Sequence, residues 1–423
     1  MNLNKIILIV FTISCLSTIS CKKQPIPMEI TSSDSIVQKF YAINQPSLFW
    51  FSSNQNIKKA KKWIIEIEAA QRYGIVSDQL QIDLIKTVLS KKRTIDNELK
   101  EQTDQQITGL VLNYMKDFQE GNAHFDYDEI KVEHDYFYIA QLLSSKRRES
   151  VSKLLSRLEC KDPDYLILKK YLNDSISEND TLKYKAVIVA MNYRKHLSFN
   201  RQQEYIVVNI PEAMARYYRD NSMLMEMRAV AGKTKTPTPT IASHISIIVT
   251  FPFWNVPHSI AAKEILQKVQ NDEIYLERNN LYVVDGMGIN VDDSLLNWEN
   301  FTEKTFPYYF RQSTGSMNSL GVLKFDLQSP FSIYLHSTSS QSSFLKDYRF
   351  LSHGCIRLEK PIDLAEGILR GKLDIEELKR GKKDTVSAKL VPPNLVQVFI
   401  IYSPVAVIEN RVTFLPDVYR LIK

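Results

Sequence analysis

The chain has 423 residues, of which 44% are hydrophobic and 24% are charged. This length allows two or three domains with an ample core, and this composition is that of an ordinary globular protein. The formal charge is only +6, with no cluster of Lys and Arg and no basic stripe rich in aromatic residues, so the sequence argues against nucleic acid as a partner.

The N-terminus has the pattern of a targeting segment. A lysine near the start precedes an apolar stretch, residues 6–19, that is too short to span a bilayer. Small residues before Cys21 resemble a relaxed bacterial lipobox, so we expect residues 1–20 to be a lipoprotein-type signal peptide and Cys21 to be lipidated. The alternatives are a plain secretory peptide and lipidation at Cys15. Residues 21–35 then form a flexible tether, and no later stretch is long and apolar enough to cross a membrane.

Residues 36–200 are predicted to be α-helical. Apolar residues recur with the period of a helix over residues 57–73, and Gly74 ends the pattern. Further helices are expected at residues 80–89, 107–118, 135–145, 150–159, 163–172 and 181–196. Stripes of this kind indicate core packing rather than a cofactor site.

From residue 204 the pattern changes to short strands. Asp220, Asn221 and Ser222 form a turn signal between two apolar runs, which predicts a hairpin. Strands are expected at residues 204–210, 213–219, 223–231, 244–250, 322–327, 331–335, 396–402, 405–408 and 411–414. Residues 259–320 interrupt them with helical and irregular sequence, and a further helix is expected at residues 361–369.

One stretch of this second region carries chemistry. His336 follows the strand at residues 331–335, and a polar loop separates it from Gly354 and Cys355. A thiol is a nucleophile only as thiolate, and a histidine that takes its proton supports that state, so a thiolate–imidazolium pair is expected. Gly354 allows a sharp turn whose main-chain N–H groups, with that of Cys355, can face an oxyanion. A small buried cysteine and a zinc site are the alternatives, but no fourth zinc ligand lies nearby.

The cysteine count bears on the same question. The four cysteines are Cys15, Cys21, Cys160 and Cys355. In an oxidising compartment Cys160 and Cys355 could form a disulfide, which would consume the candidate nucleophile. We expect no such bond, because Cys160 lies in a helical segment of the other region.

The stretch from His336 to Arg357 resembles the signature of the L,D-transpeptidases, cysteine enzymes that cross-link bacterial peptidoglycan. Their pattern is a histidine on a strand, a loop of about fifteen residues, then Ser/Thr-His/Ser-Gly-Cys, an aliphatic residue, and Arg or Asn. The resemblance implies that His336 is the general base, Cys355 the acyl-carrying nucleophile and Arg357 part of the substrate site. It also implies an oxyanion loop formed by Ser352, His353 and Gly354.

The resemblance extends over most of the chain. The sequences at residues 208–211, 232–233, 237–239 and 254–257 are similar to the start of the catalytic domain in the large members of the family. The implied fold is α+β, with an N-terminal α-helical scaffold domain (36–200) and a mainly-β catalytic domain (203–423) that carries an inserted capping subdomain (259–320). Further candidate substrate-binding residues are Ser337, Trp254 and Arg311. For Trp254 a place in the core, and for Arg311 a surface ion pair, are the alternatives.

The implied reaction is peptidoglycan cross-linking. Cys355 would attack the bond between the L-centred third residue and D-Ala of a tetrapeptide stem, and the thioester would pass to a side-chain amine of a second stem, giving a cross-link of the 3-3 type. The expected partners are donor and acceptor stem peptides and, through the lipidated N-terminus, a membrane of the cell envelope or periplasm, with no metal or other cofactor. Carbapenems are expected to acylate Cys355. An L,D-carboxypeptidase, another cysteine peptidase of the wall and a non-catalytic envelope scaffold are the alternatives.

Overall fold

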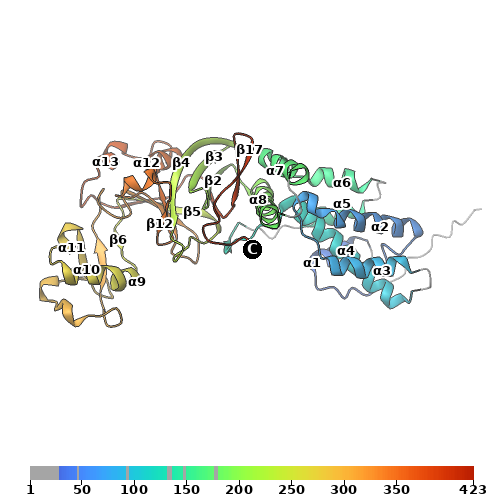
Figure 1. Cartoon of the computed structure of the whole chain (residues 1–423), viewed down its shortest axis with the longest axis horizontal. Helices are drawn as coiled ribbons and strands as arrows, with labels where there is room; N and C mark the ends of the chain where they lie inside the picture. Colours follow the sequence, from blue (N-terminus) through green and yellow to red (C-terminus); the bar gives the residue numbers. More distant parts are fainter. Residues whose placement is uncertain (1–27, 45–46, 92–94, 131–135, 146–148, 176–179) are drawn as a thin grey trace, which may run out of the picture.

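The computed structural model describes residues 28–44, 47–91, 95–130, 136–145, 149–175 and 180–423. Figure 1 shows three parts in a row, with helices at one end, a β-rich part in the middle and a smaller unit at the other end. The predicted signal peptide, with Cys15 and Cys21, lies outside the described residues. None of the described helices has both the length and the apolar character needed to cross a bilayer.

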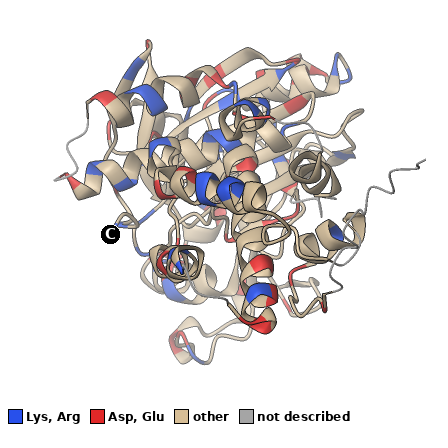
Figure 2. Ribbon diagram, turned by 90° about the vertical axis from the view of Figure 1, so that its right-hand side faces the viewer, with Lys and Arg blue, Asp and Glu red and all other residues tan. Residues whose placement is uncertain are grey.

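The first part of the chain is helical, as predicted. Its helices are α1 (Ser35–Ile43), α2 (Asn54–Glu68), α3 (Gln79–Ser90), α4 (Asn97–Glu120), α5 (Phe137–Ser144), α6 (Val151–Leu158), α7 (Pro163–Asp174) and α8 (Thr181–Asn200), with a 3-10 turn at Ala70–Tyr73. Basic and acidic residues are interspersed over this end of the molecule (Figure 2). Helix α4 begins ten residues earlier than expected. Its first turn is capped by the Asp96 side chain, which accepts from Leu99 N at 2.7 Å.

A buried carboxylate explains why that part of α4 was missed. Asp104 is fully buried and accepts hydrogen bonds from the Tyr41 hydroxyl (2.6 Å) and from the main-chain N–H groups of Phe49, Trp50 and Phe51 (3.0, 2.8 and 3.0 Å). Burial raises the pKa of Asp104 even though these hydrogen bonds oppose the shift. A buried polar residue on the inner face of a helix breaks the apolar stripe from which the sequence prediction was made.

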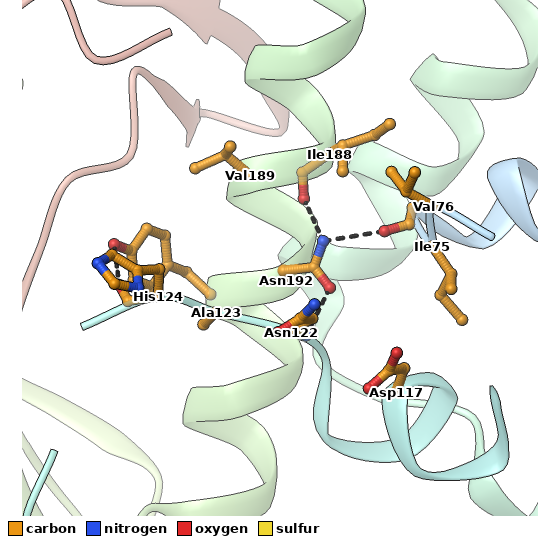
Figure 3. Close-up of a pocket in the computed structure, with 11 residues that line it drawn as sticks. Ile75, Val76, Asp117, Asn122, Ala123, His124, Ile188, Val189 and Asn192 are labelled. Atoms are coloured by element: carbon orange, nitrogen blue, oxygen red, sulfur yellow. Dashed lines mark hydrogen bonds between the residues drawn. The ribbon is translucent and has the colours of Figure 1, made fainter. Parts of the chain in front are cut away.

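A second buried side chain ties the helices to the segment that leaves them. Asn192 of α8 donates to the carbonyls of Gly74 and Ile188, both at 2.9 Å, and accepts from Asn122 N at 2.9 Å. Figure 3 shows these bonds at the side of a cavity of about 220 Å³ between α8, the end of α4 and the turn after Tyr73. The chain that follows α4 is thereby fixed as it runs toward the β-rich part.

The middle of the molecule is an eleven-stranded sheet that closes on itself. Its principal strand order is β1-β5-β10-β11-β13-β4-β3-β2-β15, and β5 also pairs with β15, while β12 and β14 pair with β4 and β5. The strands are β1 (Tyr127–Asp128), β2 (Glu204–Asn209), β3 (Met214–Arg219), β4 (Ser222–Gly232), β5 (Ile241–Thr250), β10 (Leu323–Leu327), β11 (Tyr334–His336), β12 (Phe350–Ser352), β13 (Ile356–Leu358), β14 (Ala388–Leu390) and β15 (Gln397–Ile401). Helix α12 (Pro361–Leu369) packs its apolar face into the same core. The predicted α+β class is confirmed.

The helical part contributes directly to this sheet. Strand β1, which lies between α4 and α5 in sequence, pairs in parallel with the start of β5, and Asp126 fixes it by accepting from Thr240 N (2.7 Å) and Thr240 Oγ1 (2.9 Å). The C-terminal hairpin of β16 (Val405–Ile408) and β17 (Arg411–Phe414) packs against α7 and α8. The two parts therefore share cores at both places.

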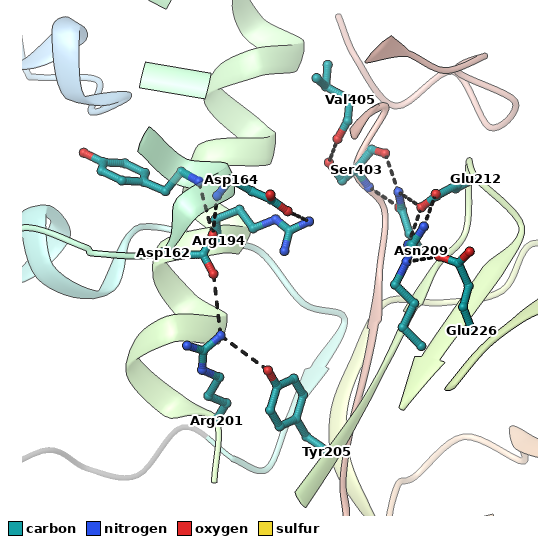
Figure 4. Close-up of polar contacts among 12 residues, drawn as sticks. Asp162, Asp164, Arg194, Arg201, Tyr205, Asn209, Glu212, Glu226, Ser403 and Val405 are labelled. Carbon is teal, nitrogen blue, oxygen red and sulfur yellow. Dashed lines mark hydrogen bonds and ion pairs between the residues drawn. The ribbon is translucent and has the colours of Figure 1, made fainter. Parts of the chain in front are cut away.

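Polar contacts complete this junction, as Figure 4 shows. Asp162, which caps α7 by accepting from Tyr165 N at 3.1 Å, forms an ion pair with Arg201 at 3.5 Å. The same guanidinium donates to the hydroxyl of Tyr205 on β2 at 3.3 Å. One arginine at the end of α8 thus connects a helix terminus to the first long strand of the sheet.

The unit at the far end, which we call the cap, is residues 254–312. It has a four-stranded sheet in the order β6 (Trp254–Asn255), β9 (Tyr309–Gln312), β7 (Leu281–Val284) and β8 (Asn290–Val291). Helical segments α9 (His258–Ile260), a π-helical turn (Ala261–Ile265), α10 (Leu266–Asn271) and α11 (Tyr275–Arg278) enclose a hydrophobic core of its own. The sequence indicated only helical and irregular structure here. The strands were missed because they are two to four residues long.

Candidate active site

The alternation of side chains along two adjacent strands determines on which face of the sheet the candidate catalytic residues lie. Strands β11 and β13 pair in parallel with Leu335 opposite Ile356 and His336 opposite Arg357. Leu335 and Ile356 are fully buried in the core of the sheet. Since successive side chains of a strand point to opposite faces, His336 and Arg357 lie on the other face, together with the residues two positions before them, Tyr334 and Cys355. The strand at residues 331–335 is shorter than expected, since pairing begins at Tyr334.

The thiol of Cys355 is free, and Cys160 is free and buried, so the disulfide alternative is not realised. The Cys355 thiol donates to the main-chain carbonyl of Ser332 with the sulfur 3.6 Å from the oxygen. Burial raises the pKa of Cys355, although hydrogen bonds from Tyr334 and the positive charges of Lys324 and Arg357 act in the opposite direction. The thiol is therefore protonated at neutral pH.

His336 is buried and its tautomer is fixed by the main chain. Its Nδ1–H donates to the carbonyl of Ser337, which leaves Nε2 as the nitrogen able to accept a proton. Burial, with the nearby charges of Arg357 and Lys324, lowers the pKa of His336 to about 3. The shifts of both pKa values oppose the expected thiolate–imidazolium pair in the resting site, because burial favours the neutral form of each group.

The turn before the nucleophile is held from within. Ser352 Oγ donates to the carbonyl of Cys355 at 2.6 Å and accepts from Gly354 N at 3.1 Å. The Gly354 N–H, expected to face an oxyanion, is thus occupied by Ser352. Gly354 has φ +120°, and a Cβ at this position would lie 3.0 Å from Ile333 Cδ1, so the turn favours glycine.

A neighbouring loop supports the same turn from outside. Thr238 Oγ1 accepts from Gly232 N at 2.9 Å and donates to the carbonyl of Gly354 at 2.7 Å. The carbonyl of Ser352 accepts from Lys233 N at 2.9 Å and from the hydroxyl of Thr236 at 3.2 Å. Residues 232–238 therefore support residues 352–355, which we call the nucleophile turn. In the sequence, residues 232–233 and 237–239 were noted only for their similarity to the family.

Arg357 has spare hydrogen-bonding capacity. Burial lowers the pKa of its guanidinium, while Cys355 opposes this shift. Among the described residues its Nε is buried with no hydrogen-bond partner. A buried donor that lacks a partner costs free energy, so a ligand oxygen placed here would relieve that cost.

The other three predicted substrate-binding residues have structural contacts of their own, and their part in substrate binding stays a prediction. The side chain of Ser337 is buried against Gly321, where φ is +61° and a Cβ would collide with it. Trp254 is half-buried against the core of the cap, which fits the alternative that it is a core residue. Arg311, on β9, donates to Asn255 Oδ1 at 2.7 Å within the cap sheet.

His353, by contrast, reaches out of the turn. It is the exposed member of the Ser352–Cys355 segment, and its Nε2 lies 2.6 Å from Glu264 Oε1 of the cap. This is a direct contact between the nucleophile turn and the cap.

Tyr334 and Lys324 were not among the site residues predicted from the sequence. Lys324 on β10 lies opposite His336, and its Nζ is 4.4 Å from the centre of the Tyr334 ring and 2.6 Å from Asp326 Oδ1. The rings of Tyr334 and His336 meet edge to face with centroids 5.6 Å apart. The only available signal was the two-residue spacing of Tyr334 and His336 on one strand, which indicates a shared face.

Comparisons with known proteins match two parts of the chain. The family model described as the L,D-transpeptidase catalytic domain matches residues 203–379, and a model described as a scaffold domain matches residues 35–172. A putative L,D-transpeptidase of Haemophilus influenzae is 35% identical over 217 residues, which are 51% of this chain and 44% of the relative. The chain thus spans less than half the length of that relative.

Solved L,D-transpeptidase structures show a weaker likeness. The catalytic domain of the Enterococcus faecium enzyme acylated by ertapenem is 14% identical with a TM-score of 0.21, and the match covers 37% of this chain and 82% of that one. L,D-transpeptidase 3 of Mycobacterium tuberculosis, in complex with a faropenem-derived adduct, is 14% identical with a TM-score of 0.22 and coverages of 47% and 60%.

Proposed function

The chain belongs to the L,D-transpeptidase family, with the catalytic domain preceded by a scaffold domain, and on this premise we propose that it cross-links peptidoglycan stem peptides through Cys355. The observation that carries the proposal is the shared face of β11 and β13. It carries a thiol, a buried imidazole and an arginine whose Nε has no hydrogen-bond partner among the described residues. Acyl transfer needs a nucleophile, a base and a group that holds the substrate.

The neutral resting pair gives the order of the steps. The Cys355 sulfur attacks the carbonyl carbon of the L-centred third residue of a tetrapeptide stem, and the thiol proton passes to Nε2 of His336. Collapse of the tetrahedral intermediate breaks the C–N bond to D-Ala, and His336 gives this proton to the leaving amine. A side-chain amine of a second stem then attacks the thioester, forms the amide of a 3-3 cross-link and returns a proton through His336 to the sulfur.

We assign Arg357 to an oxygen of the donor stem. Its buried Nε donor, without a partner among the described residues, lies on the face that carries Cys355. A carbonyl or carboxylate oxygen there would complete its hydrogen bonding.

We further propose that acyl transfer takes place in the cell envelope with the chain anchored by a lipid on Cys21. Metabolic labelling with a tagged fatty acid tests the anchor: Cys21→Ser should lose the label and Cys15→Ser should keep it.

The nucleophile is tested with ertapenem and intact-protein mass spectrometry. We expect one covalent adduct on the full-length protein and none on Cys355→Ala. Cys160→Ala is the matched control, since it removes the other described thiol, which is buried in the helical part, and it should form the adduct as the wild type does. An adduct that survives Cys355→Ala would overturn the assignment. The absence of any adduct would favour the non-catalytic scaffold.

The acceptor is tested with purified tetrapeptide stems. Cross-linked dimers are expected among the products, whereas release of tripeptides alone would favour the L,D-carboxypeptidase or peptidase alternative. Because both reactions share the thioester, a product analysis after a fixed number of turnovers distinguishes them where the ertapenem adduct does not.

A further inference from the structure

The contact between His353 and Glu264 joins two parts of the molecule at the nucleophile. His353 lies two residues before Cys355, and Glu264 belongs to the cap. Their Nε2 and Oε1 atoms are 2.6 Å apart, which is the distance of a charge-assisted hydrogen bond from an imidazole N–H to a carboxylate.

At the cap end of this contact, Glu264 lies next to residues that are buried in the core of the cap. Glu264 lies in the π-helical turn Ala261–Ile265, and its neighbours Ala261, Ala262 and Ile265 are buried in the core of the cap. A π-helical turn widens the helix locally and is frequent at functional sites. The adjacent Lys263 turns instead toward Glu303 at 3.4 Å, a pair that stays within the cap.

The other end is fixed to the nucleophile turn. Ser352 on one side of His353 is hydrogen-bonded to Cys355 and Gly354, and Gly354 on the other side is hydrogen-bonded to Thr238. Main-chain movement at His353 would therefore be transmitted to the turn that carries the sulfur.

We propose that Glu264 is a positioning residue of this site, which through His353 holds the cap against the nucleophile turn and couples the position of one to the shape of the other. The side chains of His353 and Glu264 are 33% and 43% exposed, so water competes for the contact and it can open at small cost. Such a contact suits a site that must admit a donor, close during acyl transfer and then admit an acceptor. That consequence rests on the proposed function, but the contact itself does not.

Hydrogen–deuterium exchange on the full-length protein tests the coupling without any substrate. Glu264→Ala should speed amide exchange in residues 350–356 as well as in residues 259–268, by about two- to fivefold as expected for loss of a partly exposed ion pair. Glu264→Gln, whose amide oxygen can still accept from the imidazole, should fall between the wild type and Glu264→Ala. Combining Glu264→Ala with His353→Ala should add nothing to His353→Ala alone.

Glu303→Ala is the matched control, because it breaks an exposed ion pair whose two members both belong to the cap. It should leave exchange in residues 350–356 unchanged. Equal effects of Glu264→Ala and Glu303→Ala there, or no effect of Glu264→Ala, would overturn the proposal. The ertapenem adduct is measured on the same samples: its absence from the wild type would count against the proposed function alone, since exchange does not require acylation.

Discussion

The protonation state of Cys355 gives the first prediction at the scale of single residues. Burial raises the pKa of this thiol above its usual 9.0, so the thiolate fraction should be small at neutral pH. In Cys160→Ala protein, the rate of alkylation of Cys355 by iodoacetamide should keep rising as the pH passes 9. Mass spectrometry at a series of pH values measures it. A rate that levels off below pH 7 would instead indicate a resting thiolate–imidazolium pair.

The buried His336 gives a second prediction, on how stability depends on pH. Its pKa of about 3 in the folded protein lies below the 6.5 of a free imidazole, so the unfolded chain binds more protons between these values. Stability is therefore full above pH 6.5 and is lost as the pH falls toward 3, by about 2 kcal/mol at pH 5. Denaturant unfolding at pH 7 and pH 5 should show a smaller loss for His336→Gln than for the wild type. Equal losses in both proteins would contradict the buried neutral imidazole.

At this scale the sequence identifies residue types and not their environment. Cys355 and His336 were found because a thiol, an imidazole and a glycine in that order form a recognisable pattern. Tyr334 and Lys324 were not found, because their position near the Cys355 thiol depends on the register of β10 and β11. The neutral state of the pair depends on burial, which also cannot be read from spacing.

At the scale of elements, the loop before β5 supports the nucleophile turn through one hydroxyl. Thr238→Val keeps the shape of the side chain but leaves the carbonyl of Gly354 without this donor and Gly232 N without its acceptor. We expect a loss of about 1–3 kcal/mol in stability and slower formation of the ertapenem adduct. Thermal unfolding measures the loss of stability, and mass spectrometry of samples quenched at set times measures the rate of adduct formation.

Thr236→Val is the control for this change. The carbonyl of Ser352 that loses the Thr236 hydroxyl still accepts from Lys233 N at 2.9 Å, so little should change. If both valine variants behave alike, the support for the turn does not come from the hydrogen bond of Thr238.

Elements with a regular apolar stripe were predicted well, and the exceptions share a cause. Helix α6, whose leucines form one buried face, and strand β5 were recognised with shifts of one to three residues at their ends. The first half of α4 was missed because Asp104 stands where the stripe should continue, and the cap strands were missed because they are too short to show a period. Buried polar contacts and short pairings are decided by residues far away in sequence.

At the scale of the whole molecule, the order of a helical part followed by a β-rich part was predicted from sequence, but their union was not. A two-residue strand gives no signal, and β1 is recognised only through its pairing with β5. The shared core beside it joins Ile130, Tyr193 and Leu197 of the helical part to Tyr205, Phe399 and Ile401 of the sheet.

This shared core predicts that the β-rich part depends on the helical part. A fragment of residues 203–423 would expose Tyr205, Phe399 and the start of β5, so it should unfold at a lower temperature than the full chain or aggregate. Asp126→Ala in the full-length protein should act in the same direction, more weakly. Thermal unfolding compares the three proteins. A fragment as stable as the full chain would show that β1 is dispensable.

The position of β1 also bears on synthesis. Asp126 and its partner Thr240 are 114 residues apart, so the ribosome releases one long before the other. The early helices can form, but β1 stays unpaired until the β-rich half has been synthesised and its sheet has closed. Final docking is therefore a late event in the life of each new chain.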